Sequence, residues 1–411
     1  MAAKKKSQSA LFGALVKRQH KHKALLASLE KSSARLERRK ARLQTLEEKI
    51  AELEQQLSEP RKGRLGKRSA RDGELKRARL IFNPGSGRDD EDNAARLAKL
   101  VSCLRAHGIE ARVGLKTSGG AARKLAQEAV KAGEKLVIVA GGDGTLGDVA
   151  AELAGSSTVM GIVPTGTMNN VARSLGVPLE INDACALIGM GTTRHIDMGR
   201  VISNGDSKAE YFLECAGVGV SAIAAMGGQA FEKKHWRIVP KAVRKFFEAK
   251  PGPMHVEMDG DVVDAHTQIV TISNAPLMGN QMLAVPGAKM DDGLLDVQVY
   301  DGMGNAALVK HFKAALAGTP KEIKTYQVRH VRITSDEAVM VNSDMNVTPE
   351  QHVIEMEVVP GALSVIVGNG IGLSVPVESA PDAPTFAEDP PVTTAESAKA
   401  PPEPEPVLED A

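Results

Sequence analysis

A glycine-rich acidic segment offers the first chemistry in this sequence. The segment Gly141 to Thr145, with the letters GGDGT, follows an apolar run from Leu136 to Ala140 that predicts a buried parallel strand. Paired glycines at the carboxyl end of a strand let backbone N–H groups approach a phosphate closely, because no Cβ intervenes. Asp143 lies at that rim, where a carboxylate could hold a Mg²⁺ ion that carries a polyphosphate. A glycine-rich turn in an ordinary α/β domain would show the same pattern.

Two further loops of small and polar residues follow predicted strands. The loop Asn83 to Gly87, NPGSG, follows a short strand that ends at Phe82. The segment Pro164 to Gly176, PTGTMNNVARSLG, follows a strand from Val159 to Val163 and leads into a helix. Ligands of an open parallel sheet bind at the carboxyl ends of its strands. Three such loops together favour a phosphate-bearing ligand, although each loop alone is also typical of a tight turn.

Strands and helices alternate through the first half of the chain. Helices are predicted at Asp90 to Arg105, Gly119 to Ala132 and Leu146 to Leu153, and another strand at Ile109 to Leu115. This alternation predicts a parallel sheet with right-handed connections and helices on both faces. Such a sheet would bring the three loops to one edge.

A second, β-rich part begins near Arg194. Alternating β-branched runs dominate it, with hairpin turns such as Asn204-Gly205 and Asp259-Gly260. Helical stretches interrupt the strands near Pro240 to Glu248 and Asn305 to Ala317. With 411 residues, of which 42% are hydrophobic and 25% charged, the chain is long enough for two modest domains with cores of their own.

The apolar runs and the cysteines of the chain also indicate its cellular compartment. No run approaches the roughly 20 apolar residues that a membrane span needs, and the lysine-rich start lacks the apolar region of a signal peptide. Cys103, Cys185 and Cys215 are far apart and odd in number, which indicates reduced thiols rather than disulfides or a zinc site. We therefore expect a cytoplasmic protein.

The two ends of the chain carry opposite charge. Lys and Arg far outnumber Asp and Glu from Met1 to Arg79, whereas the segment after Pro376 is acidic, rich in proline and expected to be disordered. Leucine and isoleucine recur at heptad spacing between Leu29 and Leu57, so residues 25–57 are a candidate coiled coil for a homo-oligomer. The basic face could also contact an anionic membrane, while a solvated helix without a partner is equally compatible. Nucleic acid is the least favoured partner, because aromatic residues for stacking are almost missing there.

The ordered set NPGSG, GGDGT and PTGTMNNVAR resembles the diacylglycerol kinase catalytic family, which includes bacterial lipid kinases, sphingosine kinases and ceramide kinases. The segments Cys215 to Ala222 and Ile272 to Tyr300 are similar to further blocks of that family. The resemblance covers roughly Lys76 to Val367. Its glycine-aspartate motif is shared with NAD kinases, whereas PTGTMNNVAR and PGAKMDDGLLD are more specific.

The resemblance implies an α/β plus β architecture. A Rossmann-like nucleotide domain of the NAD kinase and diacylglycerol kinase type would precede a β-sandwich-like second domain, with an N-terminal helical extension. The expected boundaries are 1–60 for the basic helical extension, 61–76 for a linker, 77–192 for the ATP-binding domain, 193–368 for the β-rich lipid-binding domain and 369–411 for the acidic tail.

The resemblance also implies ATP and Mg²⁺ as cofactors. Asp143 would organise the metal and the phosphates, and the metal would neutralise charge during transfer. The residues expected to line the nucleotide site are Asn83, Ser86, Gly87, Thr117, Gly141, Gly142, Gly144, Thr145, Thr167 and Asn169.

Phosphoryl transfer to an alcohol needs a carboxylate that orients the hydroxyl and accepts its proton. The family usually has an Asp-Gly-Glu motif shortly before a Pro-Gly-Ala-Leu turn, and this chain has Ser343-Asp344-Met345-Asn346 before Pro360-Gly361-Ala362-Leu363. Asp344 is therefore the candidate general base, with turn capping as the alternative. Asn346 stands where the family has Glu and cannot take a proton.

Two other positions matter for the second domain. Ser221 stands where the family commonly has Asp, which weakens the case for a sphingoid substrate. Asp291, Asp292 and Asp296 match an acidic cluster that binds a structural Mg²⁺ in some bacterial members, and a polar turn beside a strand is an equal alternative.

The resulting hypothesis is an ATP-dependent lipid kinase that acts on diacylglycerol or a similar neutral lipid at the inner face of a membrane. A kinase of a soluble acceptor, as in the NAD kinases, is the enzymatic alternative. A catalytically weak or silent nucleotide-binding module recruited through its coiled coil is the alternative of another class, and Asn346 and Ser221 keep it open.

Overall fold

The computed structural model describes residues 76–87, 92–202, 210–221, 239–319, 322–344 and 346–374, together with isolated positions between Ser33 and Glu48. The predicted coiled coil, the linker, the Asn204-Gly205 turn and the acidic tail lie almost wholly outside these residues.

The first part of the described chain is a parallel sheet in the order β4-β3-β1-β2. Its strands are β1 (Arg77–Phe82), β2 (Glu110–Leu115), β3 (Leu136–Gly141) and β4 (Val159–Pro164).

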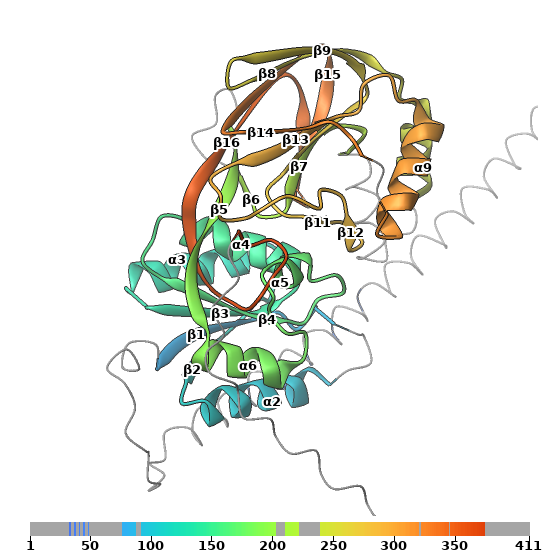
Figure 1. The fold of residues 1–411 in the computed structure, drawn as a ribbon. Coiled ribbons are helices and arrows are strands. Elements are labelled where there is room, and N and C mark those ends of the chain that lie inside the picture. Colours follow the sequence, from blue (N-terminus) through green and yellow to red (C-terminus); the bar gives the residue numbers. More distant parts are fainter. Residues whose placement is uncertain are drawn as a thin grey trace, which may run out of the picture. The chain divides into compact units, whose positions relative to one another are not determined.

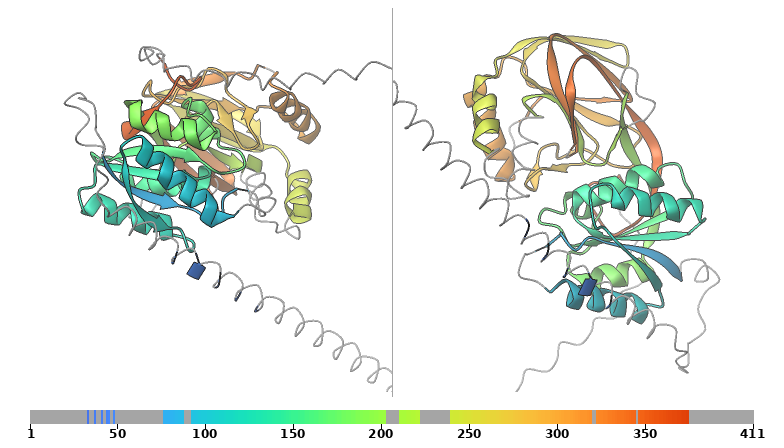
Figure 2. Two further views of the ribbon diagram at one scale, coloured as in Figure 1. Left: turned by 90° about the horizontal axis from the view of Figure 1, so that it is seen from below. Right: turned by 180° about the vertical axis from the view of Figure 1, so that it is seen from behind.

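Helices cover both faces of this sheet. One face carries α3 (Ala121–Lys131) and α4 (Asp143–Leu153), and the other carries α2 (Asn93–Ala106) and α6 (Ile181–Met190), as Figures 1 and 2 show. A short helix, α5 (Asn170–Ser174), follows the loop after β4. The central strand β3 is buried along its whole length, because neighbouring strands and both helix layers enclose its β-branched side chains.

The local patterns explain where the helices begin. The Asp92 side chain accepts a hydrogen bond from the Ala94 N–H at 2.9 Å and so caps α2. In contrast, α4 begins directly at Asp143, three residues before the predicted start, and Gly142 is its N-cap residue with an extended backbone. The helix α6 was not predicted, although its buried residues Ala184, Cys185 and Ile188 stand at helical spacing.

The second part is built mainly from antiparallel strands. Its helices are α8 (Val239–Glu248) and α9 (Asn305–Leu316). Its strands are β5 (Thr192–Ile202), β6 (Glu210–Phe212), β7 (Cys215–Gly219), β8 (Gly252–Met258), β9 (Asp261–Thr267), β10 (Ile269–Ser273), β11 (Leu277–Met278), β12 (Met282–Leu283), β13 (Leu295–Val299), β14 (Thr325–Val328), β15 (His330–Ser343) and β16 (Asn346–Val367). Alternate side chains from β7, β8, β10, β13, β15 and β16 form one buried apolar core. The predicted Asp259-Gly260 turn is confirmed between β8 and β9, where both residues have positive φ.

The last strand joins the two parts. Near its start β16 pairs with β15, along much of its length it pairs with β5, and at Val365 it pairs in parallel with Met160 of β4. A register shift lies between Val359 and Leu363, around the Pro360-Gly361 turn residues. As a result, one 14-stranded sheet runs through both parts. Its main path has the order β14-β13-β10-β7-β15-β16-β4-β3-β1-β2, and β5, β6, β8 and β9 pair off this path.

The predicted class, a Rossmann-like domain followed by a β-sandwich-like domain, is confirmed. Within the described residues, no helix is long and apolar enough to cross a bilayer. The three cysteines are free thiols.

Candidate active site

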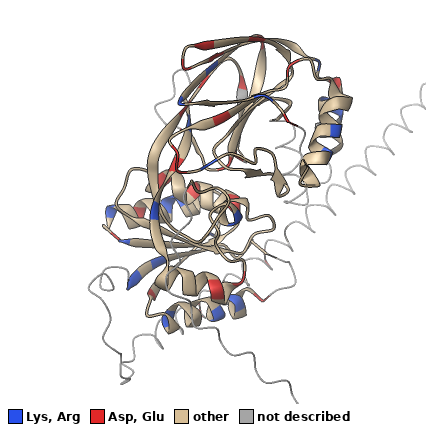
Figure 3. Ribbon diagram, viewed as in Figure 1, with Lys and Arg blue, Asp and Glu red and all other residues tan. Residues whose placement is uncertain are grey.

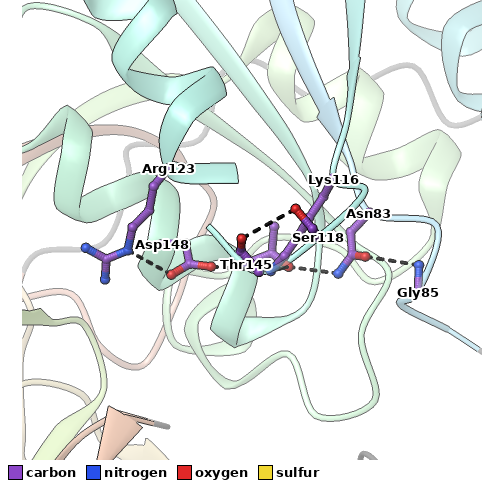
Figure 4. A network of polar contacts seen from close by, with 8 residues as sticks. Asn83, Gly85, Lys116, Ser118, Arg123, Thr145 and Asp148 are labelled. Atoms are coloured by element: carbon purple, nitrogen blue, oxygen red, sulfur yellow. Dashed lines mark hydrogen bonds and ion pairs between the residues drawn. The ribbon is translucent and has the colours of Figure 1, made fainter. Parts of the chain in front are cut away.

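The loops after β1, β2, β3 and β4 meet at the carboxyl edge of the parallel sheet. Backbone bonds hold them together: Asn83 N–H donates to Ala140 O at 2.9 Å, and Thr165 N–H donates to Gly141 O at 3.0 Å. Side chains add to this, because Asn83 Nδ2 donates to Thr145 Oγ1 at 2.9 Å (Figure 4). The residues predicted from separate motifs therefore form one site.

Two glycines bring the loops after β3 and β4 into contact. A Cβ on Gly166 would overlap the Gly142 Cα and would lie 2.9 Å from Asn169 Oδ1. Gly142 is the N-cap residue of α4, and no side chain caps the start of this helix. An uncapped helix N-terminus of this length suits an anion such as a phosphate.

Asn169 braces the loop after β4. Its backbone is left-handed with a φ of 54°, a conformation that asparagine tolerates better than most residues. Its Oδ1 accepts from Gly166 N–H at 3.0 Å and its Nδ2 donates to Gly166 O at 2.9 Å. The side chain is buried, so its first role is to shape the loop.

The other predicted nucleotide residues lie on the same edge. Ser86 Oγ and Thr165 Oγ1 are 2.7 Å apart, and Gly87 has a positive φ of 96° at the end of its loop. Thr117, Gly144 and Thr167 are exposed, each on a different one of these loops or helix starts.

Asp143 points across the edge toward α5. Its Oδ1 accepts the backbone N–H of Val171 at 3.2 Å. Burial raises the pKa of Asp143, while backbone N–H groups from Asn169 to Val171 oppose the rise by stabilising the carboxylate. A Mg²⁺ ion there would favour the ionised form.

Lys116 is a functional candidate that the motif search missed. Its Nζ lies 3.2 Å from Thr145 Oγ1 and 3.3 Å from Asp148 Oδ2, and Arg123 Nε donates to the same carboxylate at 3.0 Å (Figure 4). A cation at this place could offset phosphate charge. Its position directly after the second strand was the available signal.

Asp344 lies in the turn between β15 and β16, with a positive φ of 48°. Its Oδ1 accepts the N–H groups of Glu214 at 2.8 Å and Cys215 at 3.1 Å, and its Oδ2 accepts that of Leu213 at 2.8 Å. Burial, with a contribution from the charge of Asp143, raises the pKa of Asp344 to about 6 against the effect of these N–H donors. The carboxylate is thus fixed in place and more basic than an ordinary aspartate.

Glu214 is a second residue that the sequence analysis missed. Its side chain is buried, and its Oε2 accepts from Asn170 Nδ2 at 2.9 Å. Burial and the charges of Asp143 and Asp344 raise the pKa of Glu214 well above its usual range. Three carboxylates therefore interact where α4 and the strands of the second part approach each other, a region with acidic segments in Figure 3. The available signal was an acid within the apolar run of β6 and β7.

The two departures from the family pattern lie outside this carboxylate group. Asn346 is exposed at the start of β16. Ser221 Oγ donates to Asn342 Oδ1 at 3.0 Å, so a neutral bond occupies the position of the family's aspartate.

The predicted metal residues of the second part have separate partners. Asp291 Oδ1 accepts Ser374 N–H at 2.6 Å, and Asp292 Oδ1 accepts Leu294 N–H at 3.1 Å. Burial and the charge of Asp292 raise the pKa of Asp296 to about 6. Within the part of the chain that the structure describes, no group of three acidic, histidine or cysteine side chains could hold a metal. A Mg²⁺ at these aspartates stays a prediction.

Comparison with known proteins agrees with this geometry. Residues 77–201 match the diacylglycerol kinase catalytic domain, and residues 215–367 match the YegS C-terminal NAD kinase beta sandwich-like domain. A protein of Pseudomonas fluorescens named "probable lipid kinase YegS-like" is 32% identical over 257 residues, which are 59% of this chain and 78% of that protein. The chain belongs to the diacylglycerol kinase catalytic family.

Other members of the lipid kinase family are similar over most of their length. The diacylglycerol kinase of Bacillus subtilis is 29% identical over 286 residues, covering 66% of this chain and 89% of that protein. The crystal structure of a diacylglycerol kinase from Bacillus anthracis has a TM-score of 0.58 at 25% identity and covers 71% of this chain and 97% of that chain. The predicted family is therefore confirmed.

Proposed function

We propose that this protein is an ATP-dependent lipid kinase that transfers the γ-phosphate to a lipid hydroxyl, with diacylglycerol or a related neutral lipid as acceptor. The observation that carries the proposal is the convergence of Asp143, Glu214 and Asp344 beside the uncapped start of α4. A phosphate site and a carboxylate that can accept a proton lie next to each other in such an arrangement.

The residues of this edge fit a magnesium nucleotide. The uncapped N-terminus of α4 and the close approach of Gly142 and Gly166 suit phosphate oxygens, and the Asn170 Oδ1 atom is buried without a hydrogen-bond partner among the described residues. Asp143 would hold Mg²⁺, and Lys116 would offset phosphate charge. When bound, the metal would neutralise the charge that develops on the transferring group.

Asp344 would orient the acceptor hydroxyl. Its Oδ2 accepts one N–H, from Leu213, which leaves a lone pair for the proton of the alcohol. A pKa of about 6 makes this carboxylate a better proton acceptor near neutral pH than an ordinary aspartate. Glu214 holds Asn170, and through it the start of α5, against Asp143.

Peripheral contact with the inner membrane face belongs to the same proposal. The basic segment 1–60 would meet anionic lipid, and residues 25–57 would support a homo-oligomer in the cytoplasm.

Transfer of labelled γ-phosphate from ATP, with Mg²⁺, into a total lipid extract and into a panel of soluble metabolites tests the proposal. We expect a labelled lipid with the full chain. Asp143→Asn should lower the rate at least about 100-fold, because it removes the charge that holds the metal. Asp183→Asn, an exposed aspartate of α6, serves as the matched control and should keep the parental rate.

Other outcomes favour the alternatives. Label in a soluble product would support a kinase of the NAD kinase kind. Binding of ATP without label in either pool would support a catalytically silent nucleotide-binding module. Two observations are compatible with this alternative: three backbone N–H groups already bond the Asp344 carboxylate, and Asn346 is exposed.

A further inference from the structure

One sheet face in the second part is buried and yet polar. Strand register places Cys215, Ser273, Asp296 and Gln327 directly opposite one another across β7, β10, β13 and β14. Residues opposite each other in an antiparallel pair share a face, so these four form one row, here called the polar row. The alternate residues, such as Ile272 of β10, point into the apolar core.

The centre of the polar row is out of contact with water. Ser273 is 0% and Asp296 is 3% exposed. The Ser273 hydroxyl has no hydrogen-bond partner among the described residues. The Asp296 carboxylate is bonded by the side chain of Gln327, an exposed residue of β14. Buried polar groups cost free energy unless they are paired, so this hydroxyl and this carboxylate call for a further partner.

The polar row begins at the candidate general base. Asp344 N–H donates to Cys215 O at 2.7 Å, and Asp344 Oδ1 accepts Cys215 N–H at 3.1 Å. Ser273 is the next residue of the row after Cys215. A ligand whose reacting hydroxyl lies at Asp344 would thus extend along the row toward Ser273 and Asp296.

The same face becomes apolar farther from Asp344. Ile269, two alternations along β10 from Ser273, packs with Tyr300, Leu308 of α9 and Val220. Phe246 of α8 and Phe312 of α9 pack against this cluster. Polar groups near Asp344 and apolar groups under α8 and α9 therefore lie on one face of the sheet, an order that matches the polar head and apolar chain of an amphipathic ligand.

We propose that Ser273 and Asp296 bind a second hydrogen-bond donor on the acceptor lipid, next to the hydroxyl that receives the phosphate. This inference rests on the proposed lipid kinase function. A carboxylate only accepts hydrogen bonds, and the ester groups of a diacylglycerol also only accept, so a diacylglycerol has no group for Asp296 once its single hydroxyl lies at Asp344. The matching class is a neutral lipid with a second hydroxyl or an amine. An anionic head group would be repelled.

The experiment compares a monoacylglycerol with the diacylglycerol of the same acyl chain in mixed micelles. The full chain, Ser273→Ala, Asp296→Asn and the control Ser335→Ala, a buried serine of β15 outside the polar row, are assayed for KM and kcat. We expect the parent to favour the monoacylglycerol by about tenfold in kcat/KM, which corresponds to one hydrogen bond to a charged group.

Each substitution in the polar row should raise KM for the monoacylglycerol about tenfold and leave the diacylglycerol within about twofold. A sphingoid base in place of the monoacylglycerol distinguishes an amine from a hydroxyl. The thermal midpoints of Ser273→Ala and Asp296→Asn, measured without lipid, should lie at or above that of the control, because each substitution removes a buried polar group that costs free energy in the folded chain.

Contrary results separate this inference from the function on which it rests. A parent that phosphorylates diacylglycerol best, or variants that slow both lipids equally, would overturn the role of the polar row while the lipid kinase stands. A parent that labels no lipid would overturn both.

Discussion

Glu214 and Asp344 show how single residues at this site depend on the chain around them. The Asp344 carboxylate bonds the backbone of Leu213, Glu214 and Cys215, and so holds the Glu214 side chain beside Asn170. The charges of Asp143 and Asp344 raise the pKa of Glu214, and the charge of Asp143 raises that of Asp344, because like charges in a buried region repel. The folded state therefore disfavours the ionised form of Glu214 and Asp344, and such raised pKa values are common at functional sites.

Glu214→Gln should change how the free energy of unfolding depends on pH, because it removes the free-energy cost of ionising a buried carboxyl group. Burial raises the pKa of Glu214, so the folded state keeps a proton that the unfolded chain has released. Its contribution to stability is complete below the pKa of the unfolded chain and is lost as the pH rises through the folded pKa. The variant should match the parent near pH 4 and exceed its free energy of unfolding by roughly 1–3 kcal/mol at pH 8.

Urea denaturation at several pH values measures this difference. Glu128→Gln, an exposed position of α3, is the matched control and should follow the parent at every pH. Parallel curves for Glu214→Gln and the parent would show that the carboxyl is not destabilised by burial.

At the scale of elements, the nucleotide edge depends on how closely strand-end loops approach. The loop after β4 lies against Gly142 because Gly166 has no side chain, and Asn169 holds that loop in a left-handed turn. This contact sets the position of the β4 loop beside the start of α4. These two glycines thus act through the packing between the loops.

Gly166→Ala should disturb the site through this contact. The new Cβ would overlap the Gly142 Cα, so one loop must shift, at a cost of about 1–3 kcal/mol in stability. Phosphate transfer should fall at least about tenfold, because small misplacements of bound groups are costly in rate. Gly252→Ala, where a Cβ meets nothing within 4 Å, controls for the substitution itself. Equal rates for both variants would contradict the role of the contact.

At the scale of the whole described chain, β16 makes the two parts one structure. It belongs to the core of the β-rich part and also pairs with β4 of the parallel sheet. The sheet is therefore continuous from β14 to β2. A protein organised in this way should unfold cooperatively, although its two halves have different architectures.

Val365→Ala tests this cooperativity. Val365 is fully buried where β16 meets β4 and β5, so the substitution should cost about 2 kcal/mol. Hydrogen exchange should accelerate by the same factor in the slowest amides of β3 and of β10, if both exchange through global unfolding. Acceleration in β3 alone would show that the parts unfold separately.

The sequence by itself determined the local units. Apolar runs followed by loops of small and polar residues specified β1 to β4, since strand burial and turn geometry depend on neighbouring residues. The order of the motifs indicated the family. Only the tertiary structure decided which distant residues meet. Strand register placed Ser273 opposite Asp296, the path of β16 linked the two parts, and folding brought Glu214 near Asp143. Register and crossover depend on packing between segments far apart in the chain, and no local pattern records them.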